Sequence, residues 1–197
     1  GGAQHGQLVV AKITAYQQDN RNAEGEVIEI LGEAGSAEAD LLGIIRHYGL
    51  KETFETKTLM EAKEVPQQVT SRESATREDF RNLLTVTIDG ADARDFDDAI
   101  SLERTDVGYA LYVHIADVTH YVKPGSALDK EAYERGTSVY FPGAVLPMLP
   151  EALSNGICSL NQKEDRLTLS CIMQVDQNGY VMGYRFARGV INVDKRV

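Results

Sequence analysis

Five aspartates fall within ten residues of this chain, between two stretches that read as β-strands. The acidic stretch runs from Asp89 to Asp98, and Arg94 is its one basic residue. Residues 83–88 and 99–103 on either side are rich in apolar and β-branched residues, which favour strands. Like charges this close together destabilise a fold unless water or a cation neutralises them. The chain must therefore fold so that a loop between two strands presents these carboxylates to solvent or to a metal ion.

The acidic stretch has two interpretations on its residues alone. It is either a solvated acidic loop or a site for Mg²⁺ or Mn²⁺, because carboxylate oxygens without His or Cys suit hard cations rather than Zn²⁺. The spacing rejects a calcium loop of the EF-hand type, which needs Gly at its sixth position and Glu at its twelfth, where Arg94 and Ile100 stand. A magnesium site would suit the hydrolysis of phosphodiesters.

The charge balance excludes one class of nucleic-acid-binding protein. Lys and Arg number 20 against 30 Asp and Glu, a formal net charge of −10, so this is not a small polycation that coats phosphates.

The sequence contains neither a membrane span of roughly 18 apolar residues nor the start of a signal peptide. Cys158 and Cys171 lack partners at zinc-ligand spacing and are expected to be free thiols. We therefore expect a cytoplasmic protein with no membrane partner.

The first 82 residues are predicted to form two strands, a helix and a connector. The strands cover residues 8–13 and 24–31, with a polar turn at 17–22 between them. Ser36 is the expected N-cap of a helix over residues 37–48, which Gly49 ends. Residues 51–82 are charged and contain few apolar anchors, so we expect them to lie over the surface, with one short helix at 58–64.

The rest of the chain is predicted to be mainly antiparallel sheet. Residues 83–88 are expected to form a largely buried strand. Asn178-Gly179 favours a hairpin turn, because both residues accept positive φ. A helix is expected at 127–134 and another near residue 150. The other predicted strands are residues 99–103, 109–115, 167–175 and 180–192.

Four sequence blocks resemble motifs of the ribonuclease II/ribonuclease R (RNB) exoribonuclease family and occur in the same order. Their residues are closer to those of its ribonuclease R members. The first is the acidic block, Thr87-Ile88-Asp89-Gly90-Ala91-Asp92-Ala93-Arg94-Asp95-Phe96-Asp97-Asp98-Ala99. The second is Val113–Val122, which contains His-Ile-Ala-Asp-Val. The third is Arg135–Pro142 with Pro147–Pro150, and the fourth is Leu153–Leu160. Together they lie within residues 83–197.

The resemblance implies an α+β fold in three parts. Residues 1–35 would be the last strands of a cold-shock (OB) β-barrel, and residues 36–82 a helical connector. Residues 83–197 would be the first part of an RNB catalytic domain, with a mainly antiparallel sheet and flanking helices. The implied activity is that of a processive, Mg²⁺-dependent 3′→5′ exoribonuclease that releases 5′-mononucleotides. The family's later catalytic residues would lie outside this chain, so we expect the isolated fragment to have little activity.

The resemblance also assigns the site. The four metal-site aspartates would be Asp89, Asp95, Asp97 and Asp98, holding Mg²⁺ or Mn²⁺. Asp97 would be the one most closely tied to the chemical step, and Asp95 a second catalytic residue. Tyr140 would stack on a base at the 3′ end of a single-stranded RNA. Without the resemblance, Tyr140 would be read as a core aromatic. No nucleotide cofactor is implied.

For the other polar residues, a structural role is an alternative to a functional role. Arg135 and Arg166 are candidates for RNA phosphate contacts, and equally for salt bridges. His114, His120 and Asp117 lie on a predicted core strand and its exit, where hydrogen bonding is the expected role. For the whole chain, the alternative to a nuclease is a non-catalytic RNA-binding protein that retains the RNB fold. The presence of all four aspartates argues against it. A calcium-stabilised structural domain is disfavoured by the loop spacing.

Overall fold

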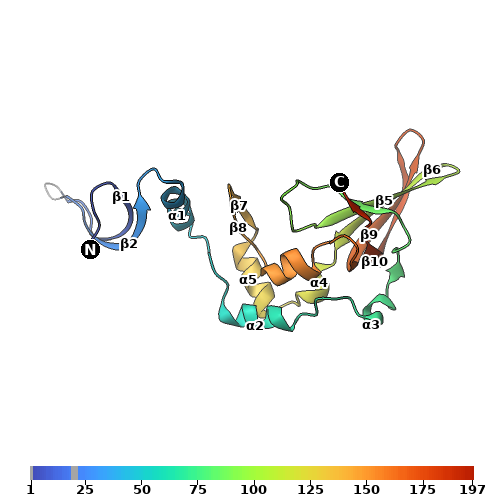
Figure 1. The fold of residues 1–197 in the computed structure, drawn as a ribbon, viewed down its shortest axis with the longest axis horizontal. Helices are drawn as coiled ribbons and strands as arrows, with labels where there is room; N and C mark the ends of the chain where they lie inside the picture. The colour runs from blue at the N-terminus through green and yellow to red at the C-terminus, as the bar shows by residue number, and fades with distance from the viewer. Residues whose placement is uncertain (1, 19–21) are drawn as a thin grey trace. The chain divides into compact units, whose positions relative to one another are not determined.

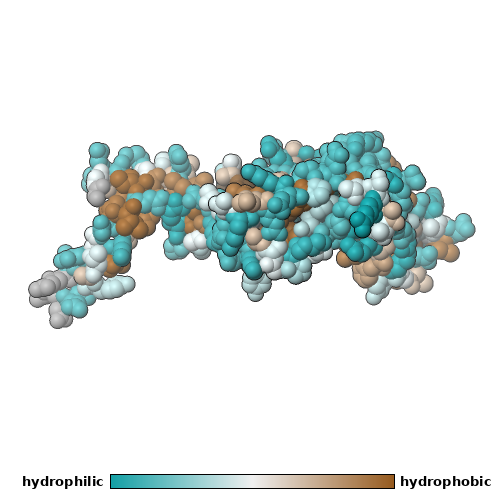
Figure 2. Space-filling model, turned by 90° about the horizontal axis from the view of Figure 1, so that it is seen from below, coloured by the Kyte–Doolittle hydropathy of each residue, from teal (hydrophilic) through white to brown (hydrophobic). Residues whose placement is uncertain are grey.

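The computed structural model describes residues 2–18 and 22–197. They form two compact units, one with the residues up to Thr53 together with Val139–Leu146, the other with Phe54–Ser138 and Pro147–Val197. No helix in the described residues is long and apolar enough to cross a membrane. The surface seen in Figure 2 is mostly hydrophilic, and apolar side chains gather on the first unit.

The first unit confirms the predicted strand pair and helix. Strands β1 (Gln7–Ala15) and β2 (Glu24–Glu33) pair in antiparallel fashion, and α1 (Ala37–His47) follows. The Ser36 hydroxyl accepts a hydrogen bond from the backbone N–H of Ala39, as an N-cap does. Residues 19–21 of the predicted turn lie outside the described residues. The unit also contains the hairpin of β7 (Val139–Phe141) and β8 (Ala144–Leu146).

The second unit is built on a seven-stranded sheet, which confirms the mainly antiparallel prediction (Figure 1). The strand order is β11-β4-β5-β6-β9-β10-β3, and only the outermost strands, β11 and β3, pair in parallel with their neighbours. The strands are β3 (Glu78–Asp79), β4 (Thr85–Thr87), β5 (Asp98–Thr105), β6 (Gly108–Ala116), β9 (Asp165–Asp176), β10 (Val181–Asn192) and β11 (Lys195–Arg196). The helical segments are α2 (Thr56–Glu64), α3 (Ser71–Ser74), α4 (Val118–Tyr121), α5 (Ala127–Arg135) and the π-helix η1 (Ala152–Ile157).

The prediction that residues 83–88 form a largely buried strand is wrong in its detail. Thr85 and Thr87 are buried, whereas Leu84 and Ile88 are each 67% exposed. The reason is strand alternation, which sends successive side chains to opposite faces of the sheet. The hydroxyls face inward and the apolar side chains outward. The outer face of the sheet carries further exposed apolar residues, namely Leu102, Ile115, Leu169 and Phe186.

The buried polar side chains of the inner face satisfy one another. Thr85 and Ser101 are joined through their hydroxyl oxygens at 2.7 Å. The His114 ring, fully buried, contacts the Ser101 hydroxyl through Nε2 at 3.3 Å and the Ser170 hydroxyl through Nδ1 at 2.7 Å. Such pairing removes the cost of burying a polar group. His114 therefore has the structural role that its strand position predicted.

The expectation that residues 51–82 lie over the surface holds for most of the segment, but it missed residues that pack into the core. Ala62 of α2 is buried in a core cluster with Leu128 and Leu153. Phe80, which follows β3, is buried in a second cluster against the inner face of the sheet. Few apolar residues are present in this segment, but these two are placed where they pack. From Phe54 on, the segment is therefore part of the folded second unit.

The buried His114 should make stability depend on pH. Burial lowers its pKa to about 4 from the usual 6.5. Between pH 4 and pH 6.5 the unfolded chain binds a proton at His114 that the folded chain does not bind. The stability is therefore unaffected by this residue above pH 6.5 and falls as the pH falls below it. We expect the free energy of unfolding to fall by about 2 kcal/mol from pH 7 to pH 5 through this residue. Urea unfolding at both pH values measures it. His114→Gln should remove that part of the pH dependence, and His47→Gln, at an exposed position, should not. Equal dependence in His114→Gln and the parent would contradict the assignment.

Two glycines on β10 provide a matched test of the core. A Cβ at Gly189 would lie 2.7 Å from ring carbons of Phe80, whereas a Cβ at Gly183 would meet nothing within 4 Å. Gly189→Ala should destabilise the protein by about 1–3 kcal/mol, because the packed ring must move. Gly183→Ala should change stability by less than about 0.5 kcal/mol. Thermal unfolding of both variants measures the difference, and equal melting temperatures would show that Phe80 does not pack there.

Candidate metal and catalytic site

The acidic residues lie on the loop that joins β4 to β5. The loop covers residues 88–97 and has no regular secondary structure, and Asp98 is the first residue of β5. Asp89, Asp95 and Asp97 belong to the loop itself. The structure thus places all four predicted metal-site aspartates on one segment, at the ends of two neighbouring strands.

The hydroxyl of Ser159 anchors this loop from a distant part of the chain. It accepts a hydrogen bond from the backbone N–H of Phe96 at 2.9 Å and donates one to the carbonyl oxygen of Arg94 at 2.8 Å. Two backbone bonds add to it. Leu160 donates to the Phe96 carbonyl at 2.8 Å, and Ala116 donates to the Asp97 carbonyl at 2.9 Å. The main chain on both sides of Asp95 is therefore fixed.

The other end of the loop is held by β11. The backbone N–H of Asp89 donates to the carbonyl of Val197 at 3.3 Å. The Arg196 guanidinium donates to the Gly90 carbonyl and lies 4.8 Å from the centroid of the Phe96 ring. Phe96 is buried in the core beneath the loop. Both ends of the acidic segment are therefore attached to the second unit.

The carboxylates lie close enough to perturb one another. Desolvation raises the pKa of Asp97, and the charges of Asp95, Asp98 and Asp89 raise it further. Asp97 reaches solvent, yet enough protein surrounds its carboxyl group to disfavour the charged form. Desolvation followed by the charge of Asp98 likewise raises the pKa of Asp89, while Arg196 opposes that rise. The cluster therefore favours any cation that approaches it.

The residues present fit a hard divalent cation. The Oδ2 atom of Asp89 is buried and has no hydrogen-bond partner within the described residues, so it is a free ligand oxygen. The side chains of the loop that could bind a metal ion are all carboxylates, which are the usual ligands of Mg²⁺ and Mn²⁺. Among residues 2–18 and 22–197, no three His, Cys, Asp or Glu side chains already converge as a metal-binding group. The assignment of Asp89, Asp95, Asp97 and Asp98 as ligands stays a prediction.

Arg166 and Arg135 both have the ion-pair partners that the sequence left open. Arg166 is buried; it pairs with Glu164 and donates to the Ser159 carbonyl at 2.7 Å. Arg135 pairs with Glu131 at 2.8 Å, and its guanidinium lies 3.8 Å from the centroid of the Phe54 ring. Contacts of these two arginines with RNA stay a prediction. Arg166 has a clear structural role, because it supports the residue that anchors the acidic loop.

Tyr140 lies on β7 and is 62% exposed. Its ring is therefore not a core aromatic, which was the interpretation without the resemblance. The β7–β8 hairpin groups with the first unit, whereas the acidic loop belongs to the second. Stacking of Tyr140 on a base stays a prediction.

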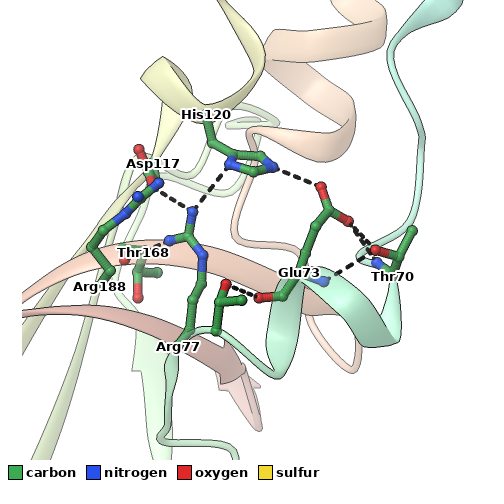
Figure 3. Close-up of polar contacts among 8 residues, drawn as sticks. Thr70, Glu73, Arg77, Asp117, His120, Thr168 and Arg188 are labelled. Carbon is green, nitrogen blue, oxygen red and sulfur yellow. Dashed lines mark hydrogen bonds and ion pairs between the residues drawn. The ribbon is translucent and has the colours of Figure 1, made fainter.

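A buried ion network holds the end of β6 beside the acidic loop (Figure 3). Arg77 forms an ion pair with Asp117 at 2.7 Å, and its guanidinium lies 3.2 Å from Nδ1 of His120. Nε2 of His120 lies 2.6 Å from Glu73 of α3. Asp117 directly follows Ala116, whose N–H bonds the Asp97 carbonyl. Asp117 and His120 are thus structural residues, as their positions predicted.

The sequence did not identify Ser159 or Arg77 as supports of the site. Ser159 stands in the block Leu153–Leu160, which is recognisable as a motif but has no role in the predicted chemistry. The one signal in the sequence was that this block follows the acidic block in the same order as in the family. Arg77 stands outside every quoted block, and only the fold brings it to Asp117.

Comparisons with known proteins agree with this architecture. The RNB domain family model matches residues 77–197, and the cold-shock domain model matches residues 1–55. The ribonuclease R of Acidithiobacillus ferrooxidans is 48% identical over 192 residues, which are 98% of this chain and 44% of that protein. The structure of Mycoplasma genitalium RNase R in complex with double-stranded RNA superposes with a TM-score of 0.90 at 29% identity. That match covers 99% of this chain and 35% of the other.

A third similar protein shares the fold alone. Yeast Ssd1, described as a pseudonuclease, superposes with a TM-score of 0.76 at 19% identity, over 98% of this chain and 25% of its own. The chain spans less than half the length of each of these three proteins. The RNB model covers the sheet, the acidic loop and the Ser159 anchor, which together make up the second unit's site. From the extent of that match and the identity to the curated relatives, the chain belongs to the RNB family.

Proposed function

We propose that this chain is part of a Mg²⁺-dependent 3′→5′ exoribonuclease that hydrolyses RNA processively to 5′-mononucleotides in the cytoplasm. The observation that carries the proposal is the anchored acidic loop, in which Asp89 has a buried, unpartnered carboxylate oxygen and Asp97 a raised pKa. The relatives named ribonuclease R, similar over nearly the whole chain, support the same activity. Mn²⁺ is an alternative to Mg²⁺ on the same donor set.

The residues of the loop divide the chemistry among them. Asp89, near the start of the loop, and Asp98, the first residue of β5, would be direct metal ligands, with Asp95 and Asp97 completing the set. A bound divalent ion supplies charge stabilisation at the phosphate and a more acidic water. Asp97, which matches the family position most closely tied to the chemical step, would orient the attacking water. The Ser159 hydroxyl keeps the backbone of Asp95 in place during this step.

The substrate would be the 3′ end of a single-stranded RNA, held by stacking. Solved complexes of the Mycoplasma genitalium enzyme contain single-stranded and double-stranded RNA. The exposed ring of Tyr140 offers a face to any base, which makes the grip independent of sequence. No membrane and no nucleotide cofactor enter this proposal.

A non-catalytic RNA-binding protein is the second candidate, because the Ssd1 fold shows that a pseudonuclease shares this architecture. All four aspartates are present here, which supports the nuclease. The two candidates predict opposite results for the replacement of Asp97, since a binding protein has no turnover to lose.

Asp97→Asn should abolish hydrolysis and spare binding. The change keeps the size of the side chain and removes one negative charge, so RNA affinity should stay equal or rise slightly. Turnover should fall by about 10³-fold or more, because the lost interaction belongs to the transition state. Single-turnover assays with a labelled RNA, on the protein at its full natural length, measure both quantities. Asp92→Asn is the matched control on the same loop and should keep the rate. Normal cleavage by Asp97→Asn would refute the assignment.

Tyr140→Ala should lengthen the smallest end product. Loss of the ring removes roughly 1–3 kcal/mol of stacking, which releases short RNAs earlier. The melting temperature should hardly change, because the residue is exposed. Tyr140→Phe should behave like the parent, since stacking needs the ring alone. Tyr133→Ala, at a position 87% exposed on α5, is the control for loss of a surface tyrosine. A destabilised Tyr140→Ala variant with unchanged end products would show a packing role instead.

A further inference from the structure

An open cavity of about 580 Å³ adjoins the acidic loop in the second unit. Arg94 and Phe96 line it from the loop itself, and Arg196 lines it from β11. Asn155, from the π-helix η1, closes another side. Within the described residues, none of the four metal-site aspartates contributes to the lining. We call this space the Arg94 cavity; the loop that carries the carboxylates also contributes Arg94 to its lining.

Many arginines of this chain are neutralised by acids, for example Arg46 by Glu29 at 2.7 Å and Arg185 by Glu78 at 2.6 Å. Arg94 stands among five aspartates in sequence, yet the structure records no ion pair for it or for Arg196 in the parts of the chain it describes. Both line the same space, but they differ in their contacts: the Arg196 guanidinium donates to the Gly90 carbonyl and lies over the Phe96 ring, whereas Arg94 is exposed.

The remaining polar groups of the lining complete a site for an anion. Asn161 is fixed, because its amide donates to the carbonyls of Asn155 and Gly156 at 3.2 and 3.5 Å. The Oδ1 atom of Asn155 accepts from the Ser154 hydroxyl, so its NH₂ group remains a donor. Glu151 is the one acidic side chain of the lining, against two arginines. The net charge of the lining is positive.

We propose that the Arg94 cavity binds a phosphate group of a nucleotide adjacent to the reacting one. Arginine presents paired N–H donors that match two phosphate oxygens. Arg94 and Asp95 are consecutive, and Ser159 holds the backbone on both sides of Asp95. A phosphate on Arg94 therefore sets the position of the neighbouring phosphate relative to the carboxylates. The inference rests on the proposed function. Its phosphate would come either from within the RNA chain or from a released mononucleotide.

The test measures binding without hydrolysis, on the protein at its full natural length with a chelator present. Affinity for a labelled single-stranded RNA is measured across a series of salt concentrations. Arg94→Gln should weaken binding by about tenfold and reduce the salt slope by about 0.7, the value for one phosphate of a single strand. Arg94→Lys should retain part of the affinity. Arg104→Gln, an exposed position on β5 with no recorded ion pair, controls for general loss of charge. Equal effects of Arg94→Gln and Arg104→Gln would overturn the proposal.

Two further arms identify the source of the phosphate. RNAs with one neutral methylphosphonate linkage, moved stepwise from the 3′ end, should lose the Arg94 effect at one position if the phosphate lies within the chain. Adenosine 5′-monophosphate should compete with RNA in the parent and not in Arg94→Gln if the site holds the released product. Failure of both arms would exclude the cavity as a phosphate site. Because no arm needs turnover, Arg94-dependent binding in a protein that does not cleave RNA would reject the proposed nuclease and retain the cavity.

Discussion

The hydrogen bonds of one hydroxyl group hold together the part of this chain where negative charge is densest. Carboxylates that repel one another would push a free loop apart. Ser159 opposes this by bonding the main chain at Phe96 and Arg94, and Arg166 fixes the carbonyl of Ser159 in turn. The charged side chains are therefore presented by a backbone that cannot relax away from them. Such preorganisation is the usual source of strength in sites that bind charge.

The sheet explains why the supports come from so many places in the chain. β4 and β5 are neighbours, so the loop between them has both ends fixed by pairing. β6 brings Ala116 to the Asp97 carbonyl, and Asp117, directly after it, is clamped by Arg77. Parallel pairing of β11 with β4 brings Arg196 to Gly90. The supports from β6 and β11 are consequences of strand order, and none of the supports is local in sequence.

This distribution shows what the sequence could predict and what it could not. Local patterns gave the β1–β2 pair, the Ser36 cap of α1 and the antiparallel β9–β10 hairpin, because alternation and capping act over a few residues. The buried face of β4 was assigned wrongly, since Thr85 and Thr87 pack inward against hydroxyl partners that only the fold supplies. The burial of Phe80 was also missed, because the core residues that it packs against are distant in sequence. In the site, the density of aspartates is visible in the sequence, and the family resemblance selects the four expected ligands. The anchoring hydroxyl instead depends on contacts across more than sixty residues.

The exposed apolar residues of the sheet affect how strongly this polypeptide self-associates in solution. Leu84, Leu102, Ile115, Leu169 and Phe186 are exposed on the side of the sheet opposite to the hydroxyl-lined interior. Exposed apolar side chains favour self-association, and excluded salts such as sulfate strengthen that tendency. The net charge of −10 works against it by keeping molecules apart, and that protection weakens as salt screens the charge. Colloidal behaviour of the chain is thus set by a contest between one apolar face and the charge around it, which ionic strength decides.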